Sequence, residues 1–145
     1  MIRVVIDTNV VISALLTPEG FEDRVLKLAL HRYIQLYVSA PILAEYGDVL
    51  HNSKFRFSKV RINRIIREIR EAANQIEPMR ILSKCRHEPD NRFLECAEAA
   101  GADFLVTGNA RHFPTQYKTT AVVSSRRLVE LLAIVRIRRP VRKNR

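Results

Sequence analysis

Three acids and one amide, Asp7, Glu45, Asp90 and Asn109, are placed where they could hold a metal ion or carry out acid–base chemistry. Asp7 directly follows IRVVI, an apolar run rich in β-branched residues that is typical of a buried parallel strand. Asn109 comes just after a second apolar run, FLVT, and Asp90 opens the helix predicted before that run. Because the carboxyl ends of parallel strands meet at one edge of a sheet, we expect these three side chains to converge there.

Glu45 would reach the same edge from the helix predicted over residues 40–51. It lies one turn into that helix, on the flank of an apolar face that includes Ile42 and Val49. A carboxylate on that flank can face along the edge of the sheet. Taken alone, an ordinary position beside an apolar face is the simpler explanation of this residue.

A cluster of carboxylates has a limited chemistry, because its charges repel one another unless one group takes up a proton or a cation lies between them. Only oxygen ligands are on offer, and these favour the hard ions Mg²⁺ or Mn²⁺, whereas paired His or Cys residues that would suit zinc are absent from the sequence pattern. Such an ion activates water and neutralises charge at a phosphodiester. The pattern therefore favours a metal-dependent nuclease.

Each of these residues also has a purely structural interpretation. Asp7 and Asp90 could cap the helices that follow them, although Phe93 occupies the position where a capping box would place Glu or Gln. Asn109 could be a turn residue after Gly108. Only the joint placement of the set favours the functional interpretation.

The net charge points to the same class of partner. The chain has 145 residues, with 25 Lys and Arg against 15 Asp and Glu, which gives a net charge of +10. Residues 136–145 contain six basic residues and no acid, so the remainder carries +4. A polyanion such as nucleic acid is the natural partner of this charge, and simple solubility is the alternative.

Apolar periodicity alternates between strands and helices along the chain, which predicts the α/β class. We expect a three-layer α/β/α fold with a short parallel sheet of four to five strands. The predicted strands cover residues 2–6, 36–38, 79–82, 104–107 and 120–123. The clearest amphipathic helix is predicted over residues 58–76. We expect one domain over residues 1–135 and a loosely ordered basic tail over residues 136–145.

Cellular location is predicted from what the sequence lacks. No signal peptide is recognisable, and no stretch approaches the length of a membrane span. Cys85 and Cys96 lack metal-binding spacing and are interpreted as free thiols of a reducing compartment. We therefore expect a cytoplasmic protein without a membrane partner.

Four segments together resemble the PIN-domain family over about residues 2–133. These are VVIDTNVVISALL, ILAEYGDVL, PDNRFLECAEAAGADFLVTGNARHF and VVSSRRLVELL. Among PIN proteins, the chain is most similar to the toxin components of type II toxin–antitoxin pairs. The resemblance implies an endoribonuclease that depends on Mg²⁺ or Mn²⁺, a cognate antitoxin as partner, and a homodimer.

The resemblance also implies roles for particular residues. Asp7 and Asp90 would be the main metal ligands, Glu45 would complete the cluster and orient the attacking water, and Asn109 would stand at the fourth position. The residues implied to support them by hydrogen bonds are Thr8, Asn9 and Thr107.

Asn109 departs from the family pattern, which usually has Asp at this position. An amide carbonyl can bind Mg²⁺ but brings no charge, so we expect one tightly bound ion and a second ion only with substrate. The alternative is a nucleic-acid-binding PIN module with weak or no catalysis. A phosphatase that uses Asp7 as nucleophile would want a second Asp where Asn9 stands.

Candidate RNA contacts lie in two basic regions and beside Asn109. Phe55 and Phe57 alternate with Lys54 and Arg56, a mixture that suits stacking on single-stranded RNA, although packing of the two rings into the core or into a dimer interface is the alternative. His112 is expected to be a surface residue. The candidate RNA-binding residues are Lys54, Arg56, Arg111, Arg138, Arg139 and Arg142.

Overall fold

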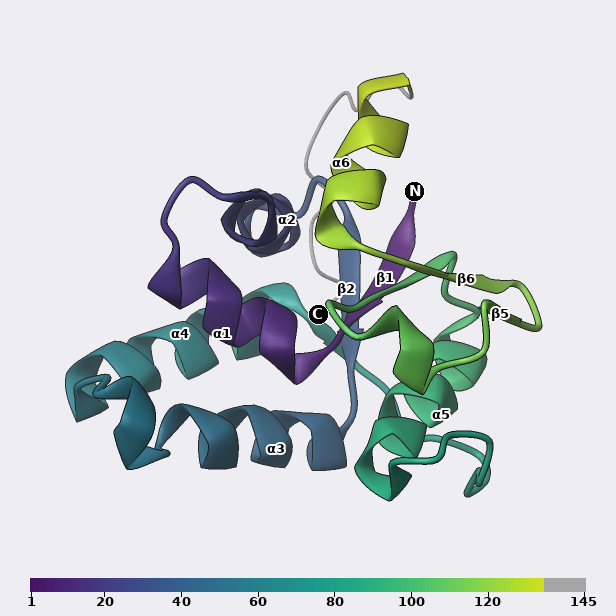
Figure 1. Cartoon of the computed structure of the whole chain (residues 1–145), viewed down its shortest axis with the longest axis horizontal. Coiled ribbons are helices and arrows are strands. Elements are labelled where there is room, and N and C mark those ends of the chain that lie inside the picture. The colour runs from purple at the N-terminus through teal and green to yellow at the C-terminus, as the bar shows by residue number, and fades with distance from the viewer. Residues whose placement is uncertain (135–145) are drawn as a thin grey trace.

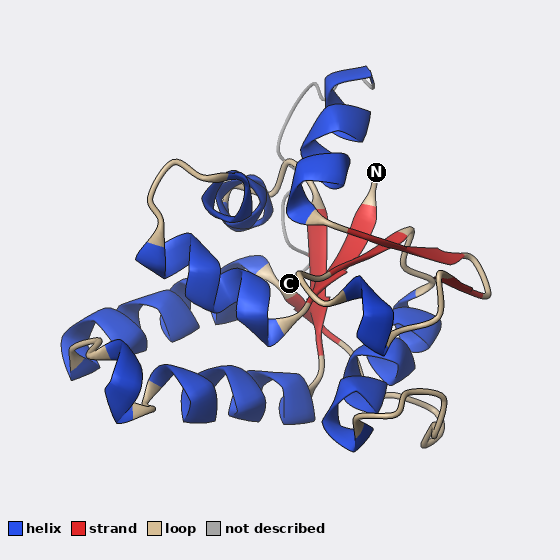
Figure 2. Cartoon of the chain, in the orientation of Figure 1, coloured by secondary structure: helices blue, strands red, loops and turns tan. Residues whose placement is uncertain are grey.

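A six-stranded sheet runs through the centre of the molecule, with helices on both faces (Figures 1 and 2). The computed structural model describes residues 1–134. The strand order is β3-β2-β1-β4-β6-β5. The neighbours from β3 to β6 pair in parallel, and β5 pairs antiparallel with β6. The strands are β1 (Arg3–Ile6), β2 (Gln35–Val38), β3 (Asn74–Gln75), β4 (Phe104–Val106), β5 (Gln116–Tyr117) and β6 (Thr120–Val123).

The helices form the two outer layers. They are α1 (Thr8–Leu16), α2 (Phe21–Leu30), α3 (Ala40–Leu50), α4 (Lys59–Ala72), α5 (Asn91–Ala100) and α6 (Ser125–Ile134). Helices α1, α2 and α6 pack together on one side of the sheet, while α5 packs on β1, β2 and β4 from the other side (Figure 1). Helix α3 contacts α1, α4 and α5. The predicted three-layer α/β/α architecture is confirmed.

Strand β1 lies in the middle of the sheet because its residues are apolar on both faces. Val4, Val5 and Ile6 are fully buried, as expected of a parallel strand covered by helices on both sides. Ile6 is in register with Val106 of β4, so β1 and β4 end side by side. The residues that follow these two strands are therefore neighbours.

The prediction of four to five strands was wrong, since the sheet has six. Residues 79–82 form a bend at 79–80 followed by irregular chain instead of the predicted strand, with Met79 and Ile81 exposed. The backbone N–H of Leu82 donates to the Glu95 carboxylate at 2.8 Å, which takes the place of a strand partner. Strands β3 and β5 have two residues each, too short to produce an alternating pattern in the sequence.

The amphipathic helix predicted over residues 58–76 is confirmed in type but ends earlier. Ser58 caps α4 by accepting the N–H of Arg61 at 3.1 Å. The helix ends at Ala72 because the next residues pair with β2 as strand β3, and the N–H of Ile76 donates to Val38 at 2.8 Å. Residues 74–75, which the apolar periodicity assigns to the helix, therefore form the edge strand β3 instead.

The predicted basic tail and the predicted absence of a membrane span remain to be compared with the structure. Arg138, Arg139 and Arg142 of the predicted basic tail lie outside the described residues. Over residues 1–134, no helix combines the length and the apolar character that crossing a membrane requires.

Candidate functional site

Asp7 and Thr107 stand at the adjoining ends of β1 and β4. The backbone N–H of Asp7 donates to Val106 at 2.9 Å, and that of Thr107 donates to Val123 at 3.0 Å. Thr107 Oγ1 donates to Asp7 Oδ2 at 2.7 Å, and both side chains are buried. This hydrogen bond from the end of β4 to the end of β1 orients the Asp7 carboxylate.

One more hydrogen bond joins the loops after β1 and β4, and another forms within the loop after β4. The N–H of Gly108 donates to Asn9 Oδ1 at 3.2 Å, and the N–H of Asn109 donates to Thr107 Oγ1 at 3.0 Å. Although Asp7 occupies the N-cap position of α1, its side chain makes no capping hydrogen bond. Capping therefore does not explain the Asp7 carboxylate.

Asp90 is the last residue of the short 3-10 helix η2 (Glu88–Asp90) and directly precedes α5. It also makes no side-chain capping hydrogen bond, and it is only 7% exposed. Its Oδ2 atom is buried without a hydrogen bond within the described part of the chain, although His112 Nδ1 lies 3.3 Å away. Burial raises the pKa of Asp90, while the nearby His87 and His112 oppose that shift.

Glu45 reaches the same edge of the sheet from α3. Its Oε2 atom accepts a hydrogen bond from Thr8, the first residue of α1. The next residue, Tyr46, is fully buried and donates its hydroxyl hydrogen to the backbone oxygen of Ile6. This contact docks α3 against the end of β1 and places Glu45 beside Asp7.

The electrostatics of Asp7 reflect this convergence. Burial raises the pKa of Asp7 to about 6, and the charges of Asp90 and Glu45 add to the shift, whereas the hydrogen bond from Thr107 opposes it. The structure therefore brings Asp7, Glu45 and Asp90 together, and we call these three residues the acidic site. A cation among them would relieve the repulsion.

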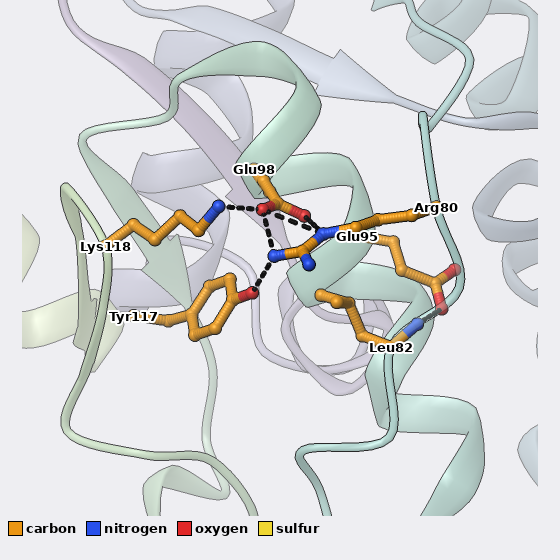
Figure 3. A network of polar contacts seen from close by, with 6 residues as sticks. All are labelled: Arg80, Leu82, Glu95, Glu98, Tyr117 and Lys118. Carbon is orange, nitrogen blue, oxygen red and sulfur yellow. Dashed lines mark hydrogen bonds and ion pairs between the residues drawn. The ribbon is translucent and has the colours of Figure 1, made fainter.

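The segment before Asp90 is held on α5 by acids of that helix (Figure 3). Glu98 accepts hydrogen bonds from Arg80 Nη2 at 2.6 Å and from Lys118, and Arg80 also donates to the Tyr117 hydroxyl at 3.0 Å. These contacts hold the pKa of Glu98 at about 2. One turn earlier, Glu95 accepts the N–H of Leu82. The network therefore holds the segment that leads to Asp90 in place against α5.

The oxygen atoms of the acidic site fit a hard divalent ion. Over residues 1–134, no group of three or more His, Cys, Asp and Glu side chains is arranged to hold a metal. Mg²⁺ commonly needs only one or two carboxylates and keeps several waters. Asp7 and Asp90, with the unbonded Oδ2 of Asp90, offer two such carboxylates.

Two histidines that sequence reasoning left aside lie beside the acidic site. His112 approaches Asp90, and the rings of His87 and His112 are 6.1 Å apart. With Arg86, Arg111 and residues 108–110, they line a cleft of about 770 Å³. Nothing in the local sequence indicates this grouping, since it depends on how α5 packs against β4.

Phe55 and Phe57, which precede α4, pack against each other and against the core rather than forming a free platform for stacking on RNA bases. Phe55 and Phe57 stack on each other at 5.9 Å between ring centroids, and both are partly buried against the core. Lys54 Nζ lies 5.0 Å from the centre of the Phe55 ring. Arg56 lies between the two aromatics in a left-handed backbone conformation, with φ of 56°. The packing interpretation of these rings is supported.

Comparisons with known proteins agree on one fold. A family model described as PIN domain matches residues 3–111. An uncharacterized protein of Methanocaldococcus jannaschii is 36% identical over 111 residues, which cover 74% of this chain and 71% of that protein. The crystal structure of VapBC2 from Rickettsia felis, bound to a DNA fragment from its promoter, has a similar chain with a TM-score of 0.56. That match covers 85% of this chain and 98% of the other at 17% identity, so it shows a shared fold.

Proposed function

Because this chain belongs to the PIN domain family, we propose that it is a metal-dependent endoribonuclease that hydrolyses phosphodiester bonds of RNA. PIN domains are generally nucleases. The observation that carries the proposal is the convergence of Asp7, Glu45 and Asp90 at one edge of the sheet, where burial and mutual repulsion raise the pKa of Asp7 to about 6. The basic balance of the chain favours a nucleic acid as substrate.

In this proposal, Asp7 and Asp90 hold Mg²⁺ or Mn²⁺. The bound ion would supply an activated water and neutralise negative charge on the phosphodiester. Thr107 keeps Asp7 oriented through its hydrogen bond to Oδ2. Glu45 is oriented by Thr8 and is placed to accept a hydrogen bond from the attacking water. Asn9 supports the loop after β4 through Gly108.

Asn109 limits the site to one tightly held ion. It is exposed, and its backbone N–H bonds to Thr107, which also bonds Asp7, so the residue lies near the acids but contributes no charge. We propose that a second ion binds only when RNA phosphate supplies the missing charge. Titration that finds two tight ions without RNA contradicts this stoichiometry.

A second candidate function is a nucleic-acid-binding module with little catalysis. The amide at position 109 favours it, because the family pattern has a carboxylate there. Metal-dependent cleavage that is lost in both Asp7→Asn and Asp90→Asn separates the two functions. RNA binding without cleavage supports the second.

The proposed biological role is that of a toxin with a cognate antitoxin. Support comes from the fold shared with a chain of the VapBC2 complex from Rickettsia felis. A homodimer and a cytoplasmic location belong to the same proposal, and the free thiols of Cys85 and Cys96 support a reducing compartment. A small antitoxin gene next to this one would support the role.

The decisive experiment is cleavage of a mixed pool of structured and single-stranded RNAs with Mg²⁺ or Mn²⁺. EDTA and Asp7→Asn serve as controls. Asp48→Asn is a matched control, because Asp48 is exposed on α3, the same helix as Glu45. We expect cleavage to be lost in the first two controls and kept in the third. Cleavage that survives both EDTA and Asp7→Asn overturns the proposal.

A further inference from the structure

A positively charged cleft lies next to the acidic site. It is lined by Arg86, His87, Arg111, His112 and residues 108–110, and we call it the basic cleft. Its volume is about 770 Å³, and among the described residues no acid lines it. The segment before Asp90 forms one wall, and the 3-10 helix η3 (Ala110–His112), which follows β4, forms the other.

The basic cleft and the acidic site share a border. His112 lines the cleft and also lies 3.3 Å from Asp90 through its Nδ1 atom. Asn109 lines the cleft and is bonded through its backbone to Thr107, which holds Asp7. A chain that passes from the acids across His112 and Asn109 therefore enters the cleft directly.

The cations of the cleft are available to a ligand. Arg86 and Arg111 are exposed, and neither forms an ion pair with any residue in the range 1–134. Other basic side chains of that region are already engaged: Arg80 and Lys118 pair with Glu98, and Arg92 pairs with Glu88 and Glu95. Arg86 and Arg111 are therefore the guanidinium groups of this region that remain available to a ligand.

We propose that the basic cleft binds the phosphate next to the one being cleaved on a single RNA strand, an inference that rests on the function proposed above. Guanidinium groups match phosphate oxygens with paired hydrogen bonds, and imidazole N–H groups can add further donors. A cluster of carboxylates repels a polyanion, so a neighbouring positive cleft is needed to draw the strand to it. The cleft thereby fixes the register in which the strand crosses Asp90.

The test measures binding of a short, fluorescently labelled single-stranded RNA to the full chain in EDTA, where no cleavage occurs. We compare the double variant Arg86→Ala and Arg111→Ala with Arg67→Ala, which removes an exposed charge from α4, far from α5 in Figure 1. The double variant should bind about tenfold more weakly, and the slope of its salt dependence should fall by about 0.7 for each phosphate that the protein no longer neutralises. Arg67→Ala should stay within about twofold of the wild type.

A second arm identifies phosphate as the ligand. Linkages of the strand are replaced one at a time by uncharged methylphosphonates. One replacement should weaken binding to the wild type but not to the double variant, because that variant already lacks the guanidinium groups that would bind the phosphate. Equal weakening of both proteins at every linkage overturns the inference.

The outcomes also separate this inference from the proposed function. A double variant that cleaves RNA with the wild-type KM contradicts phosphate binding by the basic cleft and leaves the proposed nuclease activity supported. A wild type that binds RNA through the cleft but cleaves nothing with metal overturns the nuclease and supports the binding module. A wild type that binds no RNA overturns both. Circular dichroism and thermal unfolding confirm that the exposed substitutions leave the fold intact.

Discussion

Thr107 Oγ1 donates a 2.7 Å hydrogen bond to Asp7 Oδ2, and the two residues are separated by 100 positions in the chain. The contact exists because β1 and β4 are parallel neighbours that end together, with Ile6 opposite Val106. The same hydroxyl oxygen accepts the N–H of Asn109. Thr107 therefore fixes both the carboxylate and the loop that carries the fourth position of the proposed site.

Thr107→Val tests this relationship, because valine keeps the shape of threonine and removes the hydroxyl. We expect Mg²⁺ binding to weaken by about tenfold, as expected for losing a hydrogen bond to a charged group. Isothermal titration calorimetry without RNA measures the affinity. Thr107→Ser keeps the hydroxyl and should bind Mg²⁺ close to the wild-type value. Equal affinity in the valine and serine variants would show that the hydrogen bond does not support metal binding.

Asp7→Asn is expected to stabilise the metal-free protein while abolishing the proposed nuclease activity. Burial raises the pKa of Asp7 from 3.8 to about 6, so the folded state binds the proton more tightly than the unfolded chain. The free energy of unfolding then falls as the pH rises from about 4 to about 6. Asparagine carries no charge and removes this cost, which is on the order of 3 kcal/mol above that range.

Thermal unfolding in EDTA at several pH values measures this effect. The Asp7→Asn variant should have the higher Tm at neutral pH, and the difference should shrink toward pH 4. Mg²⁺ should raise the Tm of the wild type and leave that of the variant unchanged, since an ion that binds only the folded state stabilises it. A variant that is less stable than the wild type at neutral pH would refute the prediction that the buried charge of Asp7 destabilises the metal-free fold.

The sequence predicts the acidic site well because each residue belongs to a recognisable element. Asp7 ends a buried strand and Glu45 flanks an apolar helix face, and both patterns are local. Convergence then follows from the rule that parallel strands end at one edge. The prediction that Asp90 opens a helix also holds, because the 3-10 turn before α5 shifts the boundary by only one residue.

The basic cleft and the segment before Asp90 could not be predicted in the same way. His112 meets Asp90 because α5 packs against β4, which brings the loop after β4 to the start of α5. Residues 79–82 contain apolar side chains that look like a strand, yet Leu82 bonds to the side chain of Glu95 instead. Side-chain acceptors that replace a strand partner leave no periodic signal in the sequence.

Asn109→Asp restores the carboxylate of the family pattern and should raise cleavage. The added charge would favour a second ion without RNA, because it supplies the missing negative ligand. We expect an increase in the cleavage rate of about tenfold and a change from one to two tight ions in titration. Asn109→Ala controls for loss of the amide. If Asn109→Asp binds a second ion but cleaves no faster, the amide is not what limits catalysis.

Glu98→Gln tests the network that holds the segment before Asp90 (Figure 3). Arg80 and Lys118 lower the pKa of Glu98 from 4.5 to about 2, so the ionised carboxylate stabilises the fold above about pH 4.5 and that contribution disappears as the pH falls toward 2. The free energy of unfolding of the variant should be lower by on the order of 1 kcal/mol at neutral pH, which corresponds to a few degrees in Tm. Between pH 4.5 and pH 2, the free energy of unfolding should fall less steeply for the variant than for the wild type. Glu130→Gln removes a comparable ion pair from the exposed surface of α6 and should change little. Because Glu98 lies away from the acidic site, a loss of Mg²⁺ affinity in Glu98→Gln but not in Glu130→Gln would show that the network also positions Asp90.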